Sequence, residues 1–284
     1  MKLSIIETGF FKLDGGAMFG VVPKALWNNQ NPADSQNRCT WAMRCLLVEL
    51  QNRLILVDTG IGNKQDAKFF GHYDLHGDAS LIGSIQKAGY SEKEISDVLL
   101  THLHFDHVGG AVRREGEALL PTFDNATYWT QAAHWQWAIE PNPREKASFL
   151  KENILPLQES GQLRFLDNEN LSEGEIELIQ VDGHTEKMVL PKFSLGGQTL
   201  VYAADLIPSA AHVPLPWIMS YDVRPLLTMA EKETLLRQAA VENWILIFEH
   251  DPLIEAATVE STEKGIRIKQ KGRLADLLGT SGTY

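Results

Sequence analysis

The chain has 284 residues, of which 44% are hydrophobic, so it can bury a substantial core. Its 37 Asp and Glu outnumber its 26 Lys and Arg, which gives a net charge of −11. Because an acidic surface repels a phosphate backbone, we expect no nucleic-acid partner.

In the first half of the chain, apolar runs predict strands at residues 42–50 and 53–58, joined as a hairpin. Asp78 predicts the N-cap of a helix that stops at Gly89. Residues 97–101, "DVLLT", predict a buried strand. Two helices are expected within about residues 130–160, with the break between them at Pro141 and Pro143.

The second half repeats the alternation of strands and helices. Residues 175–181 predict a strand, and residues 187–205 predict a hairpin that turns at a pair of glycines. Thr228 with Glu231 predicts the start of a helix, and residues 243–248 predict a further strand. Since no low-complexity linker divides the chain, we expect a single domain over residues 1–284 of the α/β class.

The sequence also favours a cytoplasmic protein with no membrane partner. No run approaches the roughly 18 apolar residues of a membrane span. The N-terminus lacks the cleavage pattern of a signal peptide. Cys39 and Cys45, the two cysteines, are expected to be reduced thiols.

A polar cluster follows the strand predicted at residues 97–101. The stretch "THLHFDHVGG" places His102, His104, Asp106 and His107 close together, and its two glycines are expected to permit a tight turn. Neutral imidazole and carboxylate suit Zn²⁺, with Mn²⁺ or Fe²⁺ as alternatives. The alternative is a solvated polar loop, but burying these groups without a ligand would be costly. The cluster therefore predicts a metal site.

Distant residues are needed to complete such a site, because a catalytic metal usually has three protein ligands and an open position. His184, Asp205 and His250 each lie at the end of a strand-like run, in "LIQVDGHT", "LVYAAD" and "ILIFEH". Each has an ordinary alternative as a capped turn, a loop acid or a surface histidine. Their joint occurrence predicts further ligands, since strand ends hold side chains firmly.

Together with "LVDTGIG" around Asp58, these motifs resemble the metallo-β-lactamase fold superfamily. The resemblance implies a four-layer αββα sandwich, with two β-sheets flanked by helices. It implies two metal ions with Asp58 supporting the site. The implied ligands are His102, His104 and His184 for the first metal, Asp106, His107 and His250 for the second, and Asp205 as a bridge between both.

Within that superfamily, the ligand layout and "EHDP" at His250 are similar to N-acyl-homoserine lactonases and their organophosphate-hydrolysing relatives, the quorum-quenching branch. An aspartate at the bridging position distinguishes the chain from true β-lactamases. Two positions depart from the pattern. Residues 186–188 read Glu-Lys-Met where most relatives have Pro-Gly-His, and Pro208 stands where well-known lactonases have tyrosine.

We therefore expect a dinuclear metal-dependent hydrolase in which a metal-bridging hydroxide attacks an ester or lactone, with N-acyl-homoserine lactones as candidates. Asp106 would carry the proton to the leaving group. The expected cofactors are two divalent ions, Zn²⁺ before Mn²⁺ or Fe²⁺. A phosphotriesterase and an iron-dependent oxygenase or redox protein remain alternatives.

The expected partner is a small ester or lactone, while the assembly is left open between a monomer and a homodimer. Candidate pocket residues for its acyl part are Met18, Phe19, His212, Trp217 and Tyr221. Their ordinary alternative is packing in the core, and for His212 a satisfied loop histidine. Residues 263–273 hold several cations, and we expect a solvated strand edge that is also the one patch suited to an anion.

Overall fold

Residues 1–167, 171 and 174–279 are described in a computed structural model of the chain. Chain contacts divide it into two units. Unit 1 comprises Met1–Gly9, Met43–His72 and His76–Glu173, and unit 2 comprises Phe10–Ala42, Tyr73–Leu75 and Gly174–Tyr284. The prediction of one domain over residues 1–284 is not tested by this division and stays a prediction.

A six-stranded sheet with the order β1-β2-β3-β4-β7-β8 is the main feature of unit 1, and its first two strands continue into unit 2. Strands β2 and β3 form the predicted antiparallel hairpin, while β3, β4, β7 and β8 run parallel. The strands are β1 (Lys2–Asp14), β2 (Arg38–Leu50), β3 (Arg53–Val57), β4 (Asp97–Leu99), β7 (Thr127–Thr130) and β8 (Leu163–Phe165), with the separate pair β5 (Val112–Glu115) and β6 (Ala118–Pro121). The helices are α3 (Ala67–Tyr73), α4 (Leu81–Lys87), α5 (Phe105–Val108), α6 (Ala132–Ile139) and α7 (Lys151–Glu159), with short 3₁₀ turns at Glu92–Glu94 and Gly109–Ala111.

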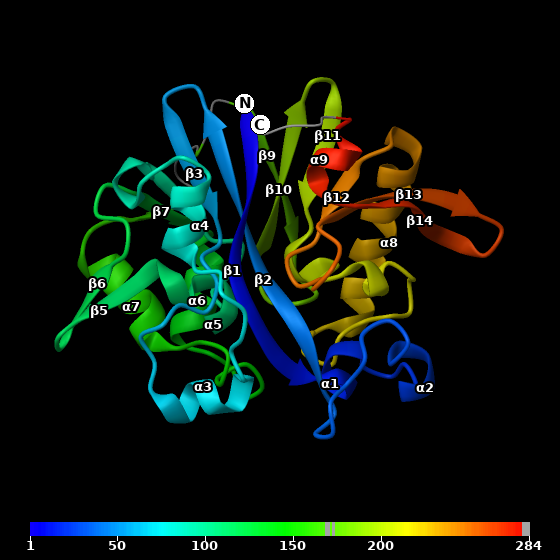
Figure 1. The fold of residues 1–284 in the computed structure, drawn as a ribbon, viewed down its shortest axis with the longest axis horizontal. Helices are drawn as coiled ribbons and strands as arrows, with labels where there is room; N and C mark the ends of the chain where they lie inside the picture. Colours follow the sequence, from blue (N-terminus) through cyan, green and yellow to red (C-terminus); the bar gives the residue numbers. More distant parts are fainter. Residues whose placement is uncertain (168–170, 172–173, 280–284) are drawn as a thin grey trace. The chain divides into compact units, whose positions relative to one another are not determined.

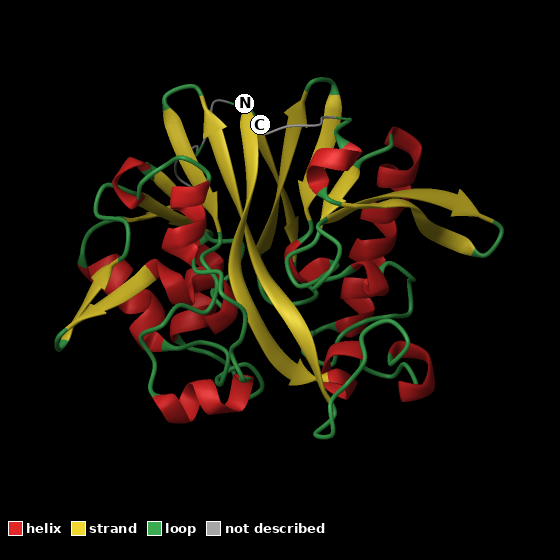
Figure 2. Ribbon diagram, in the orientation of Figure 1, coloured by secondary structure: helices red, strands yellow, loops and turns green. Residues whose placement is uncertain are grey.

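The core of unit 1 lies between this sheet and helices α4, α6 and α7, which Figures 1 and 2 show beside its strands. Ile85 of α4, Trp135 of α6 and Leu157 of α7 share one buried cluster with Leu56 and Val98 of the sheet. The helices therefore anchor the strands whose carboxyl ends carry the polar cluster. Because β3 and β4 are parallel neighbours, the loops that follow them begin at the same sheet edge.

Unit 2 contains a second six-stranded sheet with the order β14-β13-β12-β11-β10-β9. Its strands are β9 (Ile176–Val181), β10 (Met188–Leu195), β11 (Gln198–Tyr202), β12 (Ile245–Ile247), β13 (Ala256–Thr262) and β14 (Gly265–Gly272). Its helices are α1 (Gly15–Phe19), α2 (Lys24–Trp27), α8 (Pro225–Glu242) and α9 (Leu274–Leu277), with 3₁₀ turns at Ala204–Leu206 and Ala210–His212. Figure 1 shows the β13–β14 hairpin extending past helix α8.

The strand directions in unit 2 bring three loops to one edge. Strands β9 and β11 are both antiparallel to β10, so they run in the same direction, and β12 is parallel to β11. The loops after β9, β11 and β12 consequently leave the sheet at the same end. These loops carry His184, Asp205 and His250, so topology alone directs the three side chains towards one region of unit 2.

Two helix starts differ from the predictions. Ser80, not Asp78, is the N-cap of α4, and its Oγ accepts a hydrogen bond from Gly83 N at 3.2 Å. Helix α8 already begins at Pro225, because the fixed φ of proline suits the first helical position. Thr228 therefore lies inside the helix and is not its cap.

The predicted α/β class with two sheets is confirmed, as are the strands expected in both halves of the chain. Cys39 and Cys45 are buried free thiols in β2, in agreement with the expected reduced state. Among the residues that the structure describes, no helix has the length and apolar character needed to cross a membrane.

Candidate metal centre

The loop after β4 positions the first two histidines of unit 1. His102 Nε2 lies 3.1 Å from His104 Nδ1, so the two imidazoles direct one nitrogen each towards a common point. His102 Nδ1 lies 3.1 Å from Thr101 Oγ1, which holds the other nitrogen of that ring. His104 Nε2 lies 3.5 Å from a carboxylate oxygen of Glu145, an ion-pair distance longer than an ordinary hydrogen bond. Partners of this kind fix the orientation of a metal-binding imidazole.

Helix α5 carries the other pair of the cluster. His107 Nε2 lies 3.8 Å from Asp106 Oδ2, and His107 Nδ1 lies 3.2 Å from Asp58 Oδ2. Asp58 follows β3 in the left-handed region, with a φ of 57°, and also accepts hydrogen bonds from Thr101 N at 2.8 Å and Thr101 Oγ1 at 2.6 Å. The predicted supporting residue therefore links the loop after β3 to both ends of the one segment that carries the cluster.

Gly109 and Gly110 lie in the 3₁₀ turn Gly109–Ala111 that follows α5, where the sequence predicts a turn. Neither residue has a positive φ. Instead, an added Cβ at Gly109 would lie 2.1 Å from Ile61 O, and one at Gly110 would lie 2.2 Å from Thr59 O. The glycines are required because the backbone of the loop packs directly on the backbone that follows Asp58. The predicted turn is present, and the glycines are needed within it for close approach of two backbone segments.

In unit 2, Asp205 lies between the two histidines. Its Oδ2 is 3.1 Å from His184 Nε2, and its Oδ1 is 3.0 Å from His250 Nε2. The outer nitrogens are again held, because His184 Nδ1 lies 2.7 Å from Asp222 Oδ1 and His250 Nδ1 lies 2.7 Å from Ala42 O. One carboxylate thus presents one oxygen to each of two imidazoles.

The backbone before His184 is fixed by helix α8. Glu231 accepts hydrogen bonds from Asp182 N at 2.8 Å and Gly183 N at 3.0 Å. A Cβ on Gly183 would lie 2.3 Å from Thr228 N, so only glycine permits this contact. Thr228 and Glu231, predicted as a helix cap, instead hold the loop that positions a candidate ligand.

The charges around His184 favour a cation. Burial by itself would lower the pKa of His184, but Asp205 and Asp222 outweigh it and raise that pKa to about 10. Burial also raises the pKa of Asp222, in opposition to the His184 charge that lowers it. A buried position between two carboxylates stabilises positive charge, and a divalent cation can supply that charge in place of a proton.

All of the predicted ligands are buried, and each belongs to a group of side chains that could hold a metal ion. Within each unit, imidazole and carboxylate donors are oriented by further hydrogen bonds. This donor chemistry fits Zn²⁺ and similar divalent ions. The predicted ligands are His102, His104, Asp106, His107, His184, Asp205 and His250, and their assignment to particular metals stays a prediction.

The sequence did not reveal three residues that hold these donors in place: Glu145, Asp222 and His134. His134 Nε2 accepts a hydrogen bond from Leu103 N at 2.8 Å, in the middle of the ligand loop. Glu145 and Asp222 lie in irregular segments that carry no motif. Only the fold brings these residues to their partners.

The candidate pocket residues of unit 2 are largely packed. Met18, Phe19 and His212 are buried, while Tyr221 is 38% exposed. The Phe19 ring stacks on the rings of His212 and Trp27, with distances of 4.8 Å and 5.2 Å between ring centroids. The Trp217 ring meets it edge-on, with a centroid distance of 5.7 Å. These contacts form an aromatic cluster, and contact of any of its members with a substrate stays a prediction.

His212 is a satisfied neutral histidine. Its Nε2 donates to Met18 O at 2.8 Å, so its Nδ1 accepts from Ser209 Oγ at 2.7 Å. Burial lowers the pKa of His212, and the hydrogen bond to Met18 raises it by less, so that the pKa is about 3. The ordinary alternative for His212, a satisfied loop histidine, matches these contacts.

The residues at the two positions that depart from the lactonase pattern make defined contacts in the structure. Glu186 forms an ion pair with Arg224 at 2.7 Å, and Lys187, with a φ of 55°, donates its backbone N–H to Asp182 Oδ1 at 2.9 Å. Pro208 O accepts a hydrogen bond from His250 N at 2.9 Å. The local chain is therefore held by contacts of its own at both departures.

The chain was compared with protein families and with known proteins. The metallo-beta-lactamase superfamily model matches residues 44–250. An N-acyl homoserine lactonase from a Bacillus species is 24% identical over 151 residues, 50% of this chain and 54% of the relative. The match thus spans about half the length of that curated relative.

Two solved structures match nearly the whole chain. A probable metal-dependent hydrolase from Staphylococcus aureus has a TM-score of 0.85 and 28% identity, covering 96% of this chain and 98% of its own. AidC, a dizinc quorum-quenching lactonase in complex with its product, has a TM-score of 0.77 and 23% identity, covering 96% and 95%.

These matches confirm the metallo-β-lactamase fold class and support the expected enzyme class, a hydrolase. The family model covers more than half of the chain and includes every predicted metal ligand. The chain belongs to the metallo-β-lactamase superfamily.

Proposed function

We propose that the chain is a metal-dependent hydrolase in which the donors of unit 1 and unit 2 bind one pair of divalent cations, preferably Zn²⁺. Its reaction would be the hydrolysis of an ester or lactone bond. The position of Asp205 is the observation that carries this proposal. Its two oxygens contact His184 and His250, the histidines predicted for different metals, as a bridging carboxylate requires.

Support also comes from the donors of unit 1. His102 and His104 point one nitrogen each at a common position, while Asp106 and His107 form a separate pair. The pairing matches the division into two metals that the superfamily resemblance implies. The family match runs from before His102 to His250 and so includes both donor sets.

When bound, divalent cations would lower the pKa of a water molecule and polarise the carbonyl oxygen of the substrate. The chain's imidazoles must then be neutral, with fixed orientation. Asp58, Asp222 and the carbonyl of Ala42 provide that orientation by holding the Nδ1 atoms of the three histidines that they contact.

Asp106 is the residue proposed to move the proton. Its Oδ2 lies beside His107 Nε2, and its side chain is buried but not fully enclosed. A carboxylate in that position can accept a proton from the attacking water and deliver it to the leaving alkoxide, a contribution of roughly 10²–10⁴-fold in rate.

For the substrate, we propose a neutral lactone of the N-acyl-homoserine type. The names of the Bacillus relative and of AidC support this class. The net charge of −11 disfavours a polyanionic substrate at long range.

The test is hydrolysis by the zinc-loaded chain of N-acyl-homoserine lactones with increasing acyl length, aryl esters and phosphotriesters. We expect lactone or ester turnover that Asp106→Asn and Asp205→Asn abolish or strongly reduce. Asp34→Asn, a change to a partly buried carboxylate whose ion pairs are with Lys12 and Arg38, away from the loops that carry the predicted ligands, is the matched control. Turnover of phosphotriesters alone, or one redox-active iron per chain without hydrolysis, would refute the proposal.

A further inference from the structure

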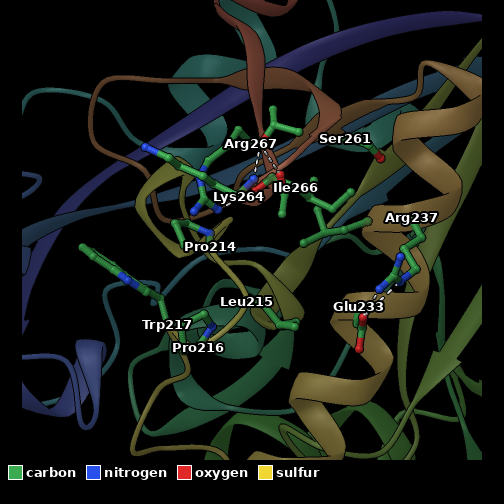
Figure 3. Close-up of a pocket in the computed structure, with 13 residues that line it drawn as sticks. Pro214, Leu215, Pro216, Trp217, Glu233, Arg237, Ser261, Lys264, Ile266 and Arg267 are labelled. Carbon is green, nitrogen blue, oxygen red and sulfur yellow. Dashed lines mark hydrogen bonds and ion pairs between the residues drawn. The ribbon is translucent and has the colours of Figure 1, made fainter.

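A groove in unit 2 contains none of the predicted metal ligands. Its volume is about 560 Å³, within the roughly 300–1,000 Å³ of small-molecule sites. Three segments form its walls: the loop at residues 214–217, helix α8 and the tip of the β13–β14 hairpin. Figure 3 shows side chains from all three segments around the groove.

The groove combines an apolar lining with an excess of cations. Leu215, Leu236 and Ile266, one from each segment, supply apolar surface. Among the described residues that line it, Arg237, Lys264 and Arg267 are cationic and Glu233 is acidic. In a chain whose net charge is −11, this local reversal of sign favours an anionic ligand.

The cationic groups differ in their existing partners. Arg237 forms an ion pair with Glu233, which Figure 3 marks with a dashed line, so this pair is neutral as a unit. Arg267 Nη1 donates to the carbonyl of Ile266 at 2.8 Å, which folds its side chain over the hairpin. Lys264 and Arg267 are both exposed at the hairpin tip, where Glu260 lies opposite Arg267 and Glu263 precedes Lys264. The two cations line the groove and these two acids do not, so the groove itself receives the positive groups of the tip.

The loop wall is held rigidly from behind. Lys232 of α8 is fully buried, and its Nζ donates to His212 O at 2.9 Å, Pro214 O at 3.1 Å and Trp217 O at 2.8 Å. Three carbonyls of one short loop thus converge on one buried amine. Because the loop is fixed before any ligand arrives, binding would require little further ordering.

We propose that this groove binds an amphipathic carboxylate, with its acyl chain along Leu215, Leu236 and Ile266 and its carboxylate at Lys264 and Arg267. An apolar lining with two cations at the hairpin tip matches that ligand in polarity and charge. Under the proposed function, an acyl compound with a free carboxylate is also the product of ester or lactone hydrolysis. The groove would then be a product site separate from the metal ligands.

The probe is octanoate, titrated calorimetrically into the full-length zinc-loaded chain at pH 6. This pH keeps Lys232 protonated, because burial lowers its pKa to about 7. We expect one saturable site, with affinity that falls as salt is raised and is much weaker for acetate and for 1-octanol. The double variant Lys264→Glu/Arg267→Glu should weaken binding at least about tenfold, since charge-assisted hydrogen bonds are lost.

The matched control is Lys269→Glu/Lys271→Glu, which changes the net charge equally on the same hairpin but outside the groove. It should bind octanoate like the parent chain. Leu215→Ser should weaken binding while leaving the charges intact. Equal weakening by both double variants, or binding unaffected by any of these changes, would overturn the proposal; binding at the metal ions, for example, would be insensitive to them.

Failure here is distinguishable from failure of the proposed function. The Lys264→Glu/Arg267→Glu variant should retain the initial hydrolysis rate of the parent chain, measured before product accumulates. A chain that hydrolyses lactones but binds no octanoate refutes the groove alone. A chain that binds octanoate in the groove but hydrolyses none of the test substrates refutes the function alone.

Discussion

The two donor sets of this chain are built in contrasting ways. In unit 1, His102, His104, Asp106 and His107 come from one short segment, held by Asp58 and by backbone packing at Gly109. In unit 2, His184, Asp205 and His250 come from three separate loops. There, the strand directions of one sheet bring the loops to the same edge.

The contrast teaches that a local set and a distributed set depend on different parts of the fold. The local set depends on the position of one loop, so changes near β3 and β4 should affect all of its members. The distributed set depends on contacts between loops, of which the carboxylate of Asp205 is the central one. The following predictions probe this difference, beginning with the largest effect.

His104→Ala should lower kcat/KM for the best ester or lactone by at least about 10³-fold, because metal ions supply several kcal/mol of transition-state stabilisation. The loop itself should stay folded, since Asp58 still holds Thr101 and His134 still holds Leu103. Steady-state kinetics, metal analysis and circular dichroism measure the three quantities. His72→Ala, at an exposed histidine of α3, is the control. Unchanged kinetics with unchanged metal content would remove His104 from the site.

Asp222→Asn tests an outer partner in the distributed set. The substitution keeps an oxygen near His184 Nδ1 but removes the negative charge that now lies 2.7 Å away. We expect metal affinity to fall about 10–100-fold, as for other partners of metal-binding histidines. A competition titration with a chelator gives the affinity, and Asp34→Asn, at a carboxylate paired with Lys12 and Arg38, is the matched control. If both variants bind metal like the parent chain, Asp222 does not support the site.

The smallest predicted effect concerns pH and His212, which belongs to the segment that follows Asp205. Since burial lowers its pKa in the folded chain to about 3, from an ordinary 6.5, the unfolded state binds more protons between these values. The stability contributed by neutral His212 is therefore complete above about pH 6.5 and is lost as the pH falls towards 3.

His212→Gln removes this titration. In urea unfolding of the metal-free chains, the free energy by which the parent exceeds the variant should shrink from pH 7.5 to pH 5. A difference that stays constant over this range would show that His212 is protonated equally in both states.

The same contrast explains how far the sequence could predict the molecule. The cluster of unit 1 could be recognised because its residues are neighbours in the sequence. Apolar runs predicted the strands that precede the ligands. The distributed ligands were found by their place at strand ends and by family resemblance. Glu145, Asp222 and His134 were not found, because their roles arise from tertiary contacts with no motif.

Helix boundaries failed for a related reason. Ser80 and Asp78 are both acceptable N-caps, and only the observed turn decides between them. At α8, Pro225 begins the helix before the capping-box pattern of Thr228 and Glu231. Glu231 therefore lies inside the helix, and its carboxylate accepts hydrogen bonds from the backbone before His184. Local patterns indicated that a helix exists, whereas packing decided where it starts.

The most direct test of the account is the metal content of Asp205→Asn beside that of the parent chain, each loaded with zinc and desalted. If Asp205 joins the two donor sets, the parent should retain two equivalents of zinc and the variant less than one, because one carboxylate serves both ions. Asp34→Asn, remote from the ligand loops, should match the parent. A variant that loses one equivalent and keeps the other at full occupancy would show that Asp205 is a terminal ligand, and would contradict a shared dinuclear centre.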